Sequence, residues 1–457
     1  MAMKKRTFVL ISTIILSLSC VACGAPGNGS IQHAQQVMTE DEPAEVILGD
    51  AQFEAYLPLL EGKRVALFTN HTGIVGDSTS GIGRIREGQD ETLIPFGWDS
   101  DYNEISYGEH ILDALIRQGV NVTAVFSPEH GFRGTEDAGA DVDDSVDEKT
   151  GVPILSLYGS DNSHAPSAES MSKFDVLVAD MQDVGLRYYT YYISMYYLMD
   201  ACAADGKEFI ILDRPNPNGF YVDDPILQDD YKSNIGQLPI PIVYGMTWGE
   251  LAQMINGEGW LSTGKDACDL TVIPCKNYTH QTKTSIIRNP SPNIKDMRAV
   301  YLYASTCFFE NTAVSVGRGT DFPFEAYGSP YLKDAEGYDF VFTPKSMAGA
   351  TEPPFMDEAC YGVDLRSIPI SEIWERQINL EYLVGAYRSI TQNKPDVSFW
   401  GTPDEQGRYW IDKLTGSDEV RKKIEAGETA EEIKAGWQDD IALFKEQRKP
   451  YLLYADI

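Results

Sequence analysis

The stretch from Val122 to Gly134 decides the fold, because it joins a buried strand to a polar turn. Its first part, Val122-Thr123-Ala124-Val125-Phe126, is a short apolar run of the kind that forms a buried strand. Its second part, Ser127-Pro128-Glu129-His130-Gly131-Phe132-Arg133-Gly134, contains one Pro and two Gly, which end the strand in a loop. This loop brings a carboxylate, an imidazole and a guanidinium within five positions. Taken alone, the pattern also suits a polar turn with a helix-capping Glu.

Apolar runs of the same kind recur on either side of this stretch. Between Lys63 and about Asn218 they alternate with patterns typical of helices. The expected strands are Arg64–Thr69, Val122–Ser127, Val152–Leu157, Asp175–Asp180 and Phe209–Asp213, and the expected helices are Glu109–Gln118, 168–173 and Arg187–Ala204. This alternation is typical of α/β proteins and predicts a Rossmann-like, doubly wound parallel sheet.

Most of the expected strands end in polar loops marked by Gly or Pro. The loops begin with Asn70-His71-Thr72-Gly73, Pro128-Glu129-His130-Gly131, Gln182-Asp183-Val184-Gly185 and Arg214-Pro215-Asn216-Pro217-Asn218. Because parallel strands end at one edge of a sheet, we expect these loops to converge on one crevice. No GxGxxG follows the first strand and no GxxxxGK[ST] occurs there, so the sheet implies neither NAD nor ATP. We expect no cofactor.

The N-terminus has the features of an export signal. Three basic residues at 4–6 precede an apolar stretch from Thr7 to Ser19, which is short for a membrane span. Small residues before Cys23, and Gly24 after it, resemble a bacterial lipoprotein processing site. Cys20 is the alternative site, and ordinary secretory cleavage without a lipid is the alternative process.

These features predict how the chain is organised. We expect residues 1–23 to be a lipoprotein signal peptide and residues 24–50 a flexible tether. The remainder is long for one core, which favours two domains, at 51–265 and 266–457. The protein is then exported and held by a lipid on the extracytoplasmic side of the bacterial membrane.

Charge and cysteine usage exclude several classes of protein. Lys and Arg number 37 and Asp and Glu 69, so the net charge of 37 − 69 = −32 argues against a nucleic-acid partner. Cysteines beyond the leader show no CxxC spacing, and the six His form no HExxH pattern, so we expect no metal site. Cys268 and Cys275 are the one pair that suits a disulfide. The acidic stretch 136–148 is not an EF-hand loop, because Val146 stands where Gly is needed.

The second half of the chain contains one dense polar segment. A helix capped by Thr247 and Glu250 is expected to run to about Gly257, and a strand at 270–274 to open the second domain. Further on, the segment from Glu310 to Glu325 places Arg318 and Asp321 among glycines, a composition that points to a site rather than a core. The tail is expected to form helices at Ser417–Ala426 and Thr429–Arg448.

At these motifs the chain resembles the exo-β-N-acetylmuramidase family of the NamZ type, formerly a family of unknown function. The resemblance runs in order over roughly residues 55–457. Its motifs are Asn70–Gly73, Ser127–Gly134, Asp180–Tyr191, Asp213–Pro217, Gly245–Thr247, Pro290–Asn293, Thr306–Glu310, Gly317–Thr320 and Tyr451–Tyr454. It implies a Rossmann-like N-terminal domain, a smaller α+β domain, and a cleft between them. It also implies removal of a terminal N-acetylmuramic acid (MurNAc) from the non-reducing end of peptidoglycan fragments such as MurNAc linked to N-acetylglucosamine (GlcNAc).

The resemblance makes Glu129 the leading catalytic carboxylate. Glycoside hydrolysis needs a proton for the leaving oxygen, and a carboxyl group with a raised pKa can supply it. Asp183 or Glu310 is the candidate for the second carboxylate, as base or nucleophile. A substrate-assisted route through the 2-acetamido group stays open, as does the choice between retention and inversion.

Other polar residues of the motifs are candidates for substrate binding. An Arg is the expected partner of the lactyl carboxylate of MurNAc, because its fork fits a carboxylate. The candidate substrate-binding residues are Asn70, His71, His130, Arg133, Arg187, Tyr188, Asn216, Arg318 and Glu325.

Three departures from the family pattern concern specificity. Tyr244 stands where the family commonly has His, Tyr278-Thr279-His280 replaces Trp-x-Arg, and residues 76–107 read as an insertion. A non-catalytic lipoprotein that binds muropeptides is the alternative function. An esterase or phosphoryl-transfer enzyme is disfavoured, because the chain lacks a GxSxG elbow and a P-loop.

Overall fold

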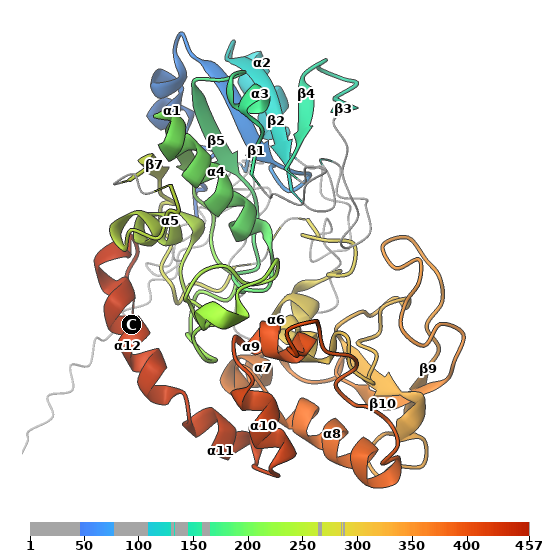
Figure 1. The fold of residues 1–457 in the computed structure, drawn as a ribbon. Helices are drawn as coiled ribbons and strands as arrows, with labels where there is room; N and C mark the ends of the chain where they lie inside the picture. The colour runs from blue at the N-terminus through green and yellow to red at the C-terminus, as the bar shows by residue number, and fades with distance from the viewer. Residues whose placement is uncertain are drawn as a thin grey trace, which may run out of the picture. The chain divides into compact units, whose positions relative to one another are not determined.

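The computed structural model describes residues 46–76, 108–128, 132, 145–157, 165–263, 267–284, 286 and 288–456. Within them, seven strands form one sheet in the order β3-β4-β2-β1-β5-β6-β7 (Figure 1). Neighbouring strands are parallel, except that β3 is antiparallel to β4. The strands are β1 Arg64–Thr69, β2 Asn121–Ser127, β3 Ser145–Val146, β4 Pro153–Ser156, β5 Val176–Asp180, β6 Glu208–Leu212 and β7 Asp269–Ile273.

Helices cover both faces of this sheet. They are α1 Phe53–Leu60, α2 Ile111–Arg117, α3 Ala168–Met171, α4 Tyr191–Asp205 and α5 Trp248–Gly257. Successive residues of a strand point to opposite faces. In β1, Val65 and Leu67 pack in one cluster with residues of α1 and α2, whereas Ala66 and Phe68 pack in another with residues of α4 and α5. Both faces are therefore buried, which explains the continuous apolar runs of the strands and confirms the doubly wound α/β fold.

The strand β7 lies in a different place from the one predicted. The sequence pattern placed a strand at 270–274 at the start of the second domain. In the structure, Asp269–Ile273 is instead the edge strand of the large sheet and pairs in parallel with β6 from Glu208 to Leu212. An apolar pattern identifies a strand but carries no information about the strand it pairs with.

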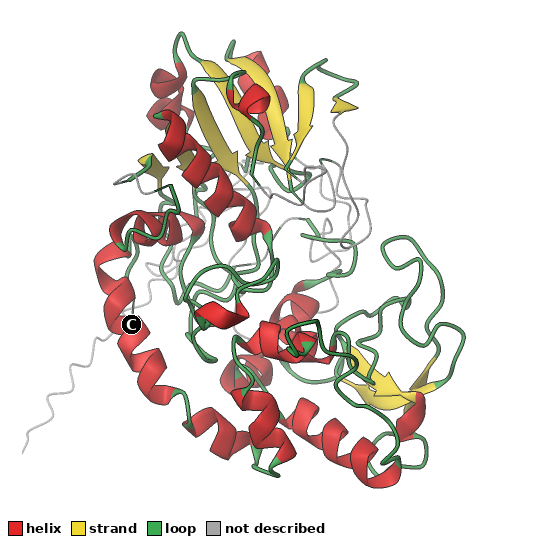
Figure 2. Ribbon diagram, in the orientation of Figure 1, coloured by secondary structure: helices red, strands yellow, loops and turns green. Residues whose placement is uncertain are grey.

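The second half of the chain has a smaller sheet than the first half and contains more helices and loops (Figure 2). Its described residues contain a three-stranded antiparallel sheet in the order β8-β10-β9. The strands are β8 Ala326–Ser329, β9 Phe340–Phe342 and β10 Cys360–Asp364, and the α-helices are α6 Met297–Thr306, α7 Ile370–Arg376, α8 Glu381–Asn393, α9 Trp410–Thr415, α10 Glu419–Glu425, α11 Ala430–Ala435 and α12 Gln438–Arg448. Short 3₁₀ helices are η2 Asp229–Tyr231, η3 Cys307–Phe309, η4 Pro330–Leu332 and η5 Lys449–Tyr451. The single helix expected over 429–448 is broken at Gly436 and Trp437.

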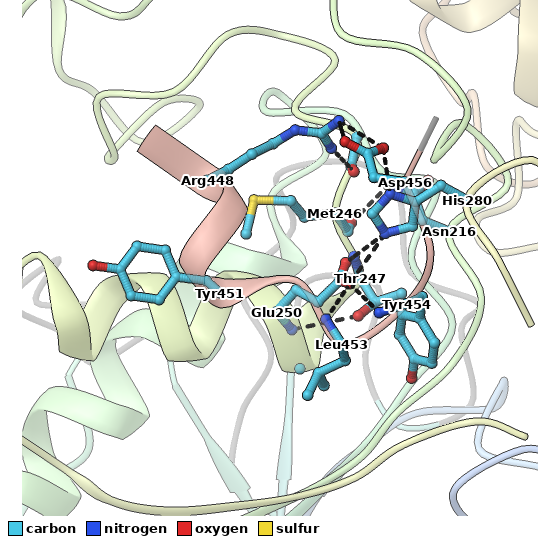
Figure 3. A network of polar contacts seen from close by, with 12 residues as sticks. Asn216, Met246, Thr247, Glu250, His280, Arg448, Tyr451, Leu453, Tyr454 and Asp456 are labelled. Atoms are coloured by element: carbon cyan, nitrogen blue, oxygen red, sulfur yellow. Dashed lines mark hydrogen bonds and ion pairs between the residues drawn. The ribbon is translucent and has the colours of Figure 1, made fainter. Parts of the chain in front are cut away.

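The C-terminal tail is joined to α5 by a polar network in which Glu250 and His280 are buried (Figure 3). Glu250 accepts hydrogen bonds from the backbone N of Leu453, at 2.8 Å, and of Tyr454, at 3.2 Å. His280 lies between Glu250, 2.9 Å from its Nε2, and Asp456, 2.9 Å from its Nδ1. Burial lowers the pKa of His280, but the hydrogen bonds to the two carboxylates outweigh this effect and raise it. His280 thus helps to hold the C-terminal tail against α5.

Two further expectations concern the cysteines and the membrane. Cys268 and Cys275 form no disulfide; both are free and buried, and the Cys275 thiol donates to the Asp213 carbonyl at 3.1 Å. In the part of the chain that the structure describes, no helix has the length and apolar character needed to cross a bilayer.

Candidate active site

The candidate site lies next to the loops at the carboxyl edge of the sheet. The strands β1, β2 and β5 are parallel neighbours that end at Thr69, Ser127 and Asp180. Their exits therefore share one edge, as the sequence predicted. Beyond β2, the described residues of this loop are Pro128 and Phe132. Three predicted site residues lie outside the described residues: Glu129, His130 and Arg133.

The exit of β1 connects this edge to the second half of the chain. Asn70 Oδ1 accepts hydrogen bonds from the backbone N of Thr72, at 2.9 Å, and from its hydroxyl, at 2.6 Å, which fixes the turn. The Asn70 Nδ2 is buried and has no hydrogen-bond partner among the described residues. His71 Nε2 lies 2.8 Å from the carbonyl oxygen of Asn289. His71 thus positions the segment from Asn289 to Asn293, which belongs to one of the sequence motifs.

A buried ion triad lies at the same edge. Arg214 binds Asp50 through Nη2 and Oδ2, 2.7 Å apart, and Asp180 through Nε and Oδ1, also 2.7 Å apart. Burial raises the pKa of Asp50 to about 8, although the Arg214 charge opposes the shift. Loss of Arg214 would leave Asp180 as an uncompensated buried charge, so Arg214 holds the ends of the loops in place.

Asp183, a candidate second carboxylate, lies in the interior. Its Oδ1 accepts a hydrogen bond from Gly185 N at 2.5 Å, and the Tyr244 hydroxyl lies 3.5 Å away. Burial raises the pKa of Asp183 to about 7, against the opposing effect of these hydrogen bonds. Asp183 lines a small cavity of about 10 Å³ together with Asn216. Tyr244 is therefore a buried neighbour of Asp183.

Asn216 braces the loops around Asp183. Its Nδ2 donates to the Met246 carbonyl at 2.8 Å, and its Oδ1 accepts a hydrogen bond from Asn218 N at 2.8 Å. Gly185 approaches this amide with φ +75°, and a Cβ there would overlap the Asn216 side chain. The structure gives Asn216 a supporting role rather than a place in either larger cavity described below.

The tyrosine run at the start of α4 is mostly structural. The hydroxyls of Tyr189 and Tyr191 donate to the Pro290 carbonyl at 2.8 and 2.9 Å. The hydroxyl of Tyr188 donates to the carbonyls of Tyr303 and Ala304 at 3.0 and 2.9 Å. Tyr188 is therefore engaged with the backbone, and its ring forms part of a cavity wall.

Two cavities meet beside these tyrosines. The larger has a volume of about 850 Å³ and the smaller about 140 Å³. Both are lined by Glu310, Arg318 and Trp410. Tyr188–Tyr191, Ser291 and Asn293 line the smaller cavity, so it connects the loop after β5 with the segment that His71 holds. We call the place where the two cavities share their lining the junction.

An ion pair forms the centre of the junction. Arg318 Nε donates to Glu310 Oε1 at 2.8 Å, and the guanidinium lies 5.0 Å from the centre of the Phe324 ring. Burial lowers the pKa of Arg318, but the attraction of Glu310 outweighs it and raises the pKa overall. The two Nη groups of Arg318 have no hydrogen-bond partner among the described residues. They remain available to a carboxylate ligand.

Backbone geometry explains why Arg318 reaches this place. Gly317 and Gly319 both have φ +80°, which only glycine adopts without strain. A Cβ on Gly319 would lie 2.6 Å from the Lys345 carbonyl oxygen. Phe324 and Asn311, at φ 67° and 57°, occupy the left-handed region without being glycine. Such strain persists where the surroundings impose it, and it concentrates at functional sites.

A family model described as "Exo-beta-N-acetylmuramidase NamZ, N-terminal" matches residues 102–298, and its C-terminal counterpart matches residues 301–454. The chain belongs to the NamZ family. It is therefore a glycoside hydrolase, and the resemblance read from the sequence motifs is confirmed.

Individual relatives cover nearly the whole chain. One from Bacillus subtilis (strain 168), named peptidoglycan beta-N-acetylmuramidase NamZ, is 31% identical over an alignment of 467 positions, which covers 99% of this chain and 100% of the relative. Two crystal structures of DUF1343 family proteins from Bacteroides fragilis NCTC 9343 are similar in fold. The first has a TM-score of 0.75 and 49% identity and covers 91% of this chain and 100% of its own; the second has 0.70 and 28% and covers 90% and 99%.

Two predicted binding residues of this NamZ chain lie outside the junction. Arg187 is fully buried and donates to the carbonyls of Ile240, at 2.5 Å, and Leu414, at 2.7 Å. Glu325 is buried near Arg298 and Arg366, and burial raises its pKa to about 8. Neither lines either cavity. Both side chains are buried in this structure, and substrate contact by either residue stays a prediction.

The site also contains residues that the sequence did not single out. Trp410, the first residue of α9, lines both cavities about a hundred residues after Glu310 in the chain. Asp404 binds Lys413 Nζ and Arg408 Nη2 at 2.8 and 2.9 Å and fixes one wall of the larger cavity. No motif marks these residues. Only the packing of α9 near η3 brings them to Glu310.

Proposed function

We propose that this protein is an exo-acting muramidase that releases the terminal non-reducing MurNAc from peptidoglycan fragments during cell-wall turnover. Membership of the NamZ family supports the hydrolysis of a muramic acid glycoside. The observation that carries the exo-acting part is the smaller cavity, whose volume is about 140 Å³. Pockets for drug-sized ligands measure about 300–1,000 Å³, so this cavity is too small for an extended glycan chain.

Arg318 is the proposed partner of the sugar's lactyl carboxylate. Its Nε is occupied by Glu310, and its two Nη groups present further donors at the junction. A guanidinium binds a carboxylate most strongly through two parallel N–H donors. The Glu310 carboxylate keeps the fork in one orientation before substrate arrives, which lowers the entropic cost of binding.

The proposed reaction uses Glu129 as the acid that protonates the leaving oxygen. Glu129 lies outside the described residues; Pro128, which precedes it in the sequence, follows directly after β2. Glu310 is the better placed of the two candidates for the second carboxylate, because it lines both cavities whereas Asp183 is buried. Its charge would stabilise the oxocarbenium-like transition state. The substrate's own acetamido group remains an alternative nucleophile.

Release of MurNAc tests this function directly. The wild-type protein is incubated with a chromogenic MurNAc glycoside and with MurNAc–GlcNAc, and the Glu129→Gln variant serves as the control. We expect free MurNAc from both substrates, and loss of a hundredfold to ten-thousandfold in the variant, since general acid catalysis contributes about 10²–10⁴. Full activity of the variant would remove Glu129 from this role. Binding of MurNAc–GlcNAc without turnover would instead indicate a muropeptide-binding protein.

The location of the protein is a separate proposal. The basic and apolar N-terminal segment followed by Cys23 supports export and lipid attachment on the extracytoplasmic side of the membrane. Cys23 and Cys20 both lie outside the described residues. Expression with a radioactive fatty acid should label the wild type and the Cys20→Ser variant, and should not label Cys23→Ser. Labelling of Cys23→Ser would transfer the site to Cys20, and no labelling at all would indicate ordinary secretion.

A further inference from the structure

Away from both cavities, three aromatic rings surround the amine of Lys283. Phe220 lies in the loop after β6, Tyr301 belongs to α6 and Trp374 to α7. The ring centres are 5.5 Å apart for Tyr301 and Trp374, 6.3 Å for Phe220 and Trp374, and 6.4 Å for Phe220 and Tyr301. Lys283 Nζ lies 2.9 Å from the centre of the Phe220 ring and 5.2 Å from that of the Trp374 ring. We call these three rings the aromatic cage.

The cage gives the Lys283 amine no partner that would keep it protonated. Nζ forms neither a hydrogen bond nor an ion pair with a described residue, whereas the half-buried Lys434 binds Asp223 at 2.7 Å. The ring faces attract a cation but provide no oxygen to accept its three N–H groups. Burial disfavours the charged form and lowers the pKa of Lys283 to about 7.

Burial is the whole cause of this shift, although several titratable or charged side chains lie on the elements around the cage. Tyr301 carries the one titratable group of the cage itself. The others, none of which contributes to the shift, are Asp223 and Asp224 after Phe220, His280 and Arg288 on either side of Lys283, Arg298 of α6, and Glu372, Glu375 and Arg376 of α7.

The amine is also within reach of small molecules. Lys283, Phe220 and Trp374 are half-buried, and Tyr301 is buried. The indole Nε1 of Trp374 is buried and has no hydrogen-bond partner among the described residues, so an unused donor belongs to the same cage. A lysine desolvated in an apolar pocket is a nucleophile of the kind that forms Schiff bases with carbonyl compounds.

We propose that Lys283 is a covalent attachment site for small aldehydes, a class that includes the open-chain form of a reducing sugar. Nζ forms a bond to the carbonyl carbon, both C–O bonds break, and the oxygen leaves as water with the two amine hydrogens. The product is an imine, and no oxidant or reductant is consumed. Trp374 Nε1 supplies a donor for the carbonyl oxygen, and the rings keep water from the imine. The reaction is separate from glycoside hydrolysis, because Lys283 and the cage line neither cavity.

Reductive trapping with glycolaldehyde tests this proposal. The whole protein is incubated with the aldehyde and cyanoborohydride, which reduces an imine to a stable amine, and each modified lysine is quantified by peptide mass spectrometry. At pH 7, Lys283 should react at least tenfold faster than Lys394, which is exposed and unpaired among the described residues. An ordinary lysine is only about 0.04% neutral at this pH. The ratio of the two rates cancels the pH dependence of the reductant and should fall roughly fiftyfold between pH 7 and pH 9.

Two variants connect the reactivity to the cage. Phe220→Glu places a carboxylate beside Nζ and should lower the ratio at pH 7 to about one. Phe322→Glu makes the same change at another half-buried ring and should leave the ratio as in the wild type. Thermal unfolding checks that both variants fold, and the wild-type ratio decides the question if either does not. A wild-type ratio near one at pH 7 would overturn the proposal, as would an unchanged ratio in a folded Phe220→Glu variant.

Discussion

Arg318 depends on its neighbours for its position more than on its own side chain. Gly317 and Gly319 turn the backbone on either side of it, and Phe324 lies under its guanidinium. Glu310 then fixes the orientation of the fork through Nε. A lysine at this position keeps the charge but cannot donate in parallel to a carboxylate.

We therefore expect Arg318→Lys to weaken binding of MurNAc substrates. KM should rise by about tenfold or more, because charge-assisted hydrogen bonds contribute about 1.5–3 kcal/mol. Steady-state kinetics on a MurNAc glycoside measure this effect, with thermal unfolding as a check that the fold is intact. The control is Arg376→Lys, since Arg376 is exposed and paired with Glu372. Equal KM values for the two variants would contradict a role for Arg318 in binding.

Asp183 carries a prediction about pH. Its folded-state pKa of about 7 lies above the ordinary value of 3.8, so the folded protein retains this proton to higher pH than the unfolded chain. The stability that this group contributes is present below pH 4 and is lost as pH rises through 7. The Asp183→Asn variant does not lose this stability, because its amide does not titrate. The unfolding free energy of the variant minus that of the wild type should therefore rise by about 2 to 4 kcal/mol between pH 4 and pH 8.

Urea unfolding at several pH values measures this difference. Asp175→Asn provides a contrast of opposite sign, because hydrogen bonds to Arg64 lower the pKa of Asp175 to about 2. Its destabilisation should be present at neutral pH and disappear as the pH falls toward 2. Parallel stability curves for Asp183→Asn and wild type would show that the Asp183 carboxyl does not titrate near 7.

At the scale of elements, α5 shows how a helix start supports the sheet edge. Thr247 and Glu250 form the capping box that the sequence predicted. Thr247 Oγ1 also donates to Asp213 Oδ2 at 2.7 Å, which ties α5 to the exit of β6. At α11, Thr429 and Glu432 form the same box on the surface.

The two capping boxes allow a direct comparison. Thr247→Ala should lower the unfolding free energy by about 2 kcal/mol, because the cap and the bond to the buried Asp213 are both lost. Thr429→Ala should cost about 1 kcal/mol or less, because water replaces the lost contacts. Chemical denaturation measures both. Equal costs would mean that the contact with Asp213 adds nothing to the stability of α5.

The positions of the strands and helices were easier to predict from the sequence than the contacts between them. Strands β1, β2, β5 and β6 lie within one or two residues of their predicted bounds, because burial on both faces demands long apolar runs. β7 was assigned to the wrong sheet because pairing is decided by tertiary packing. Arg187 and Glu325 were expected in the site because charged residues in motifs usually face ligands; their partners here are carbonyls and interior charges. Trp410 was missed because nothing near it in sequence marks a site.

At the scale of the whole molecule, the C-terminal tail closes onto the large sheet. The Tyr454 hydroxyl donates to Asp213 Oδ2 at 2.5 Å and accepts a hydrogen bond from Cys275 N at 2.9 Å. The Tyr451 hydroxyl donates to Glu258 at 2.8 Å in a more exposed place. The last residues of the chain thus support the loops that follow β6 and β7.

Removing each hydroxyl shows how much this contact contributes. Tyr454→Phe leaves the buried Cys275 N without its acceptor and removes one of the two donors to Asp213 Oδ2, so it should cost about 2–3 kcal/mol of unfolding free energy. Tyr451→Phe should cost about 1 kcal/mol or less, because water can reach Glu258. The melting temperatures of the two variants provide the measurement. A Tyr454→Phe variant as stable as Tyr451→Phe would show that the tail is not held through Asp213.

The central claim is that the terminal MurNAc binds at the junction of the two cavities. A crystal structure of the Glu129→Gln variant soaked with MurNAc–GlcNAc tests it most directly. We predict MurNAc at the junction, with its lactyl carboxylate on the Nη groups of Arg318. MurNAc bound elsewhere, or with its carboxylate away from Arg318, would contradict the claim.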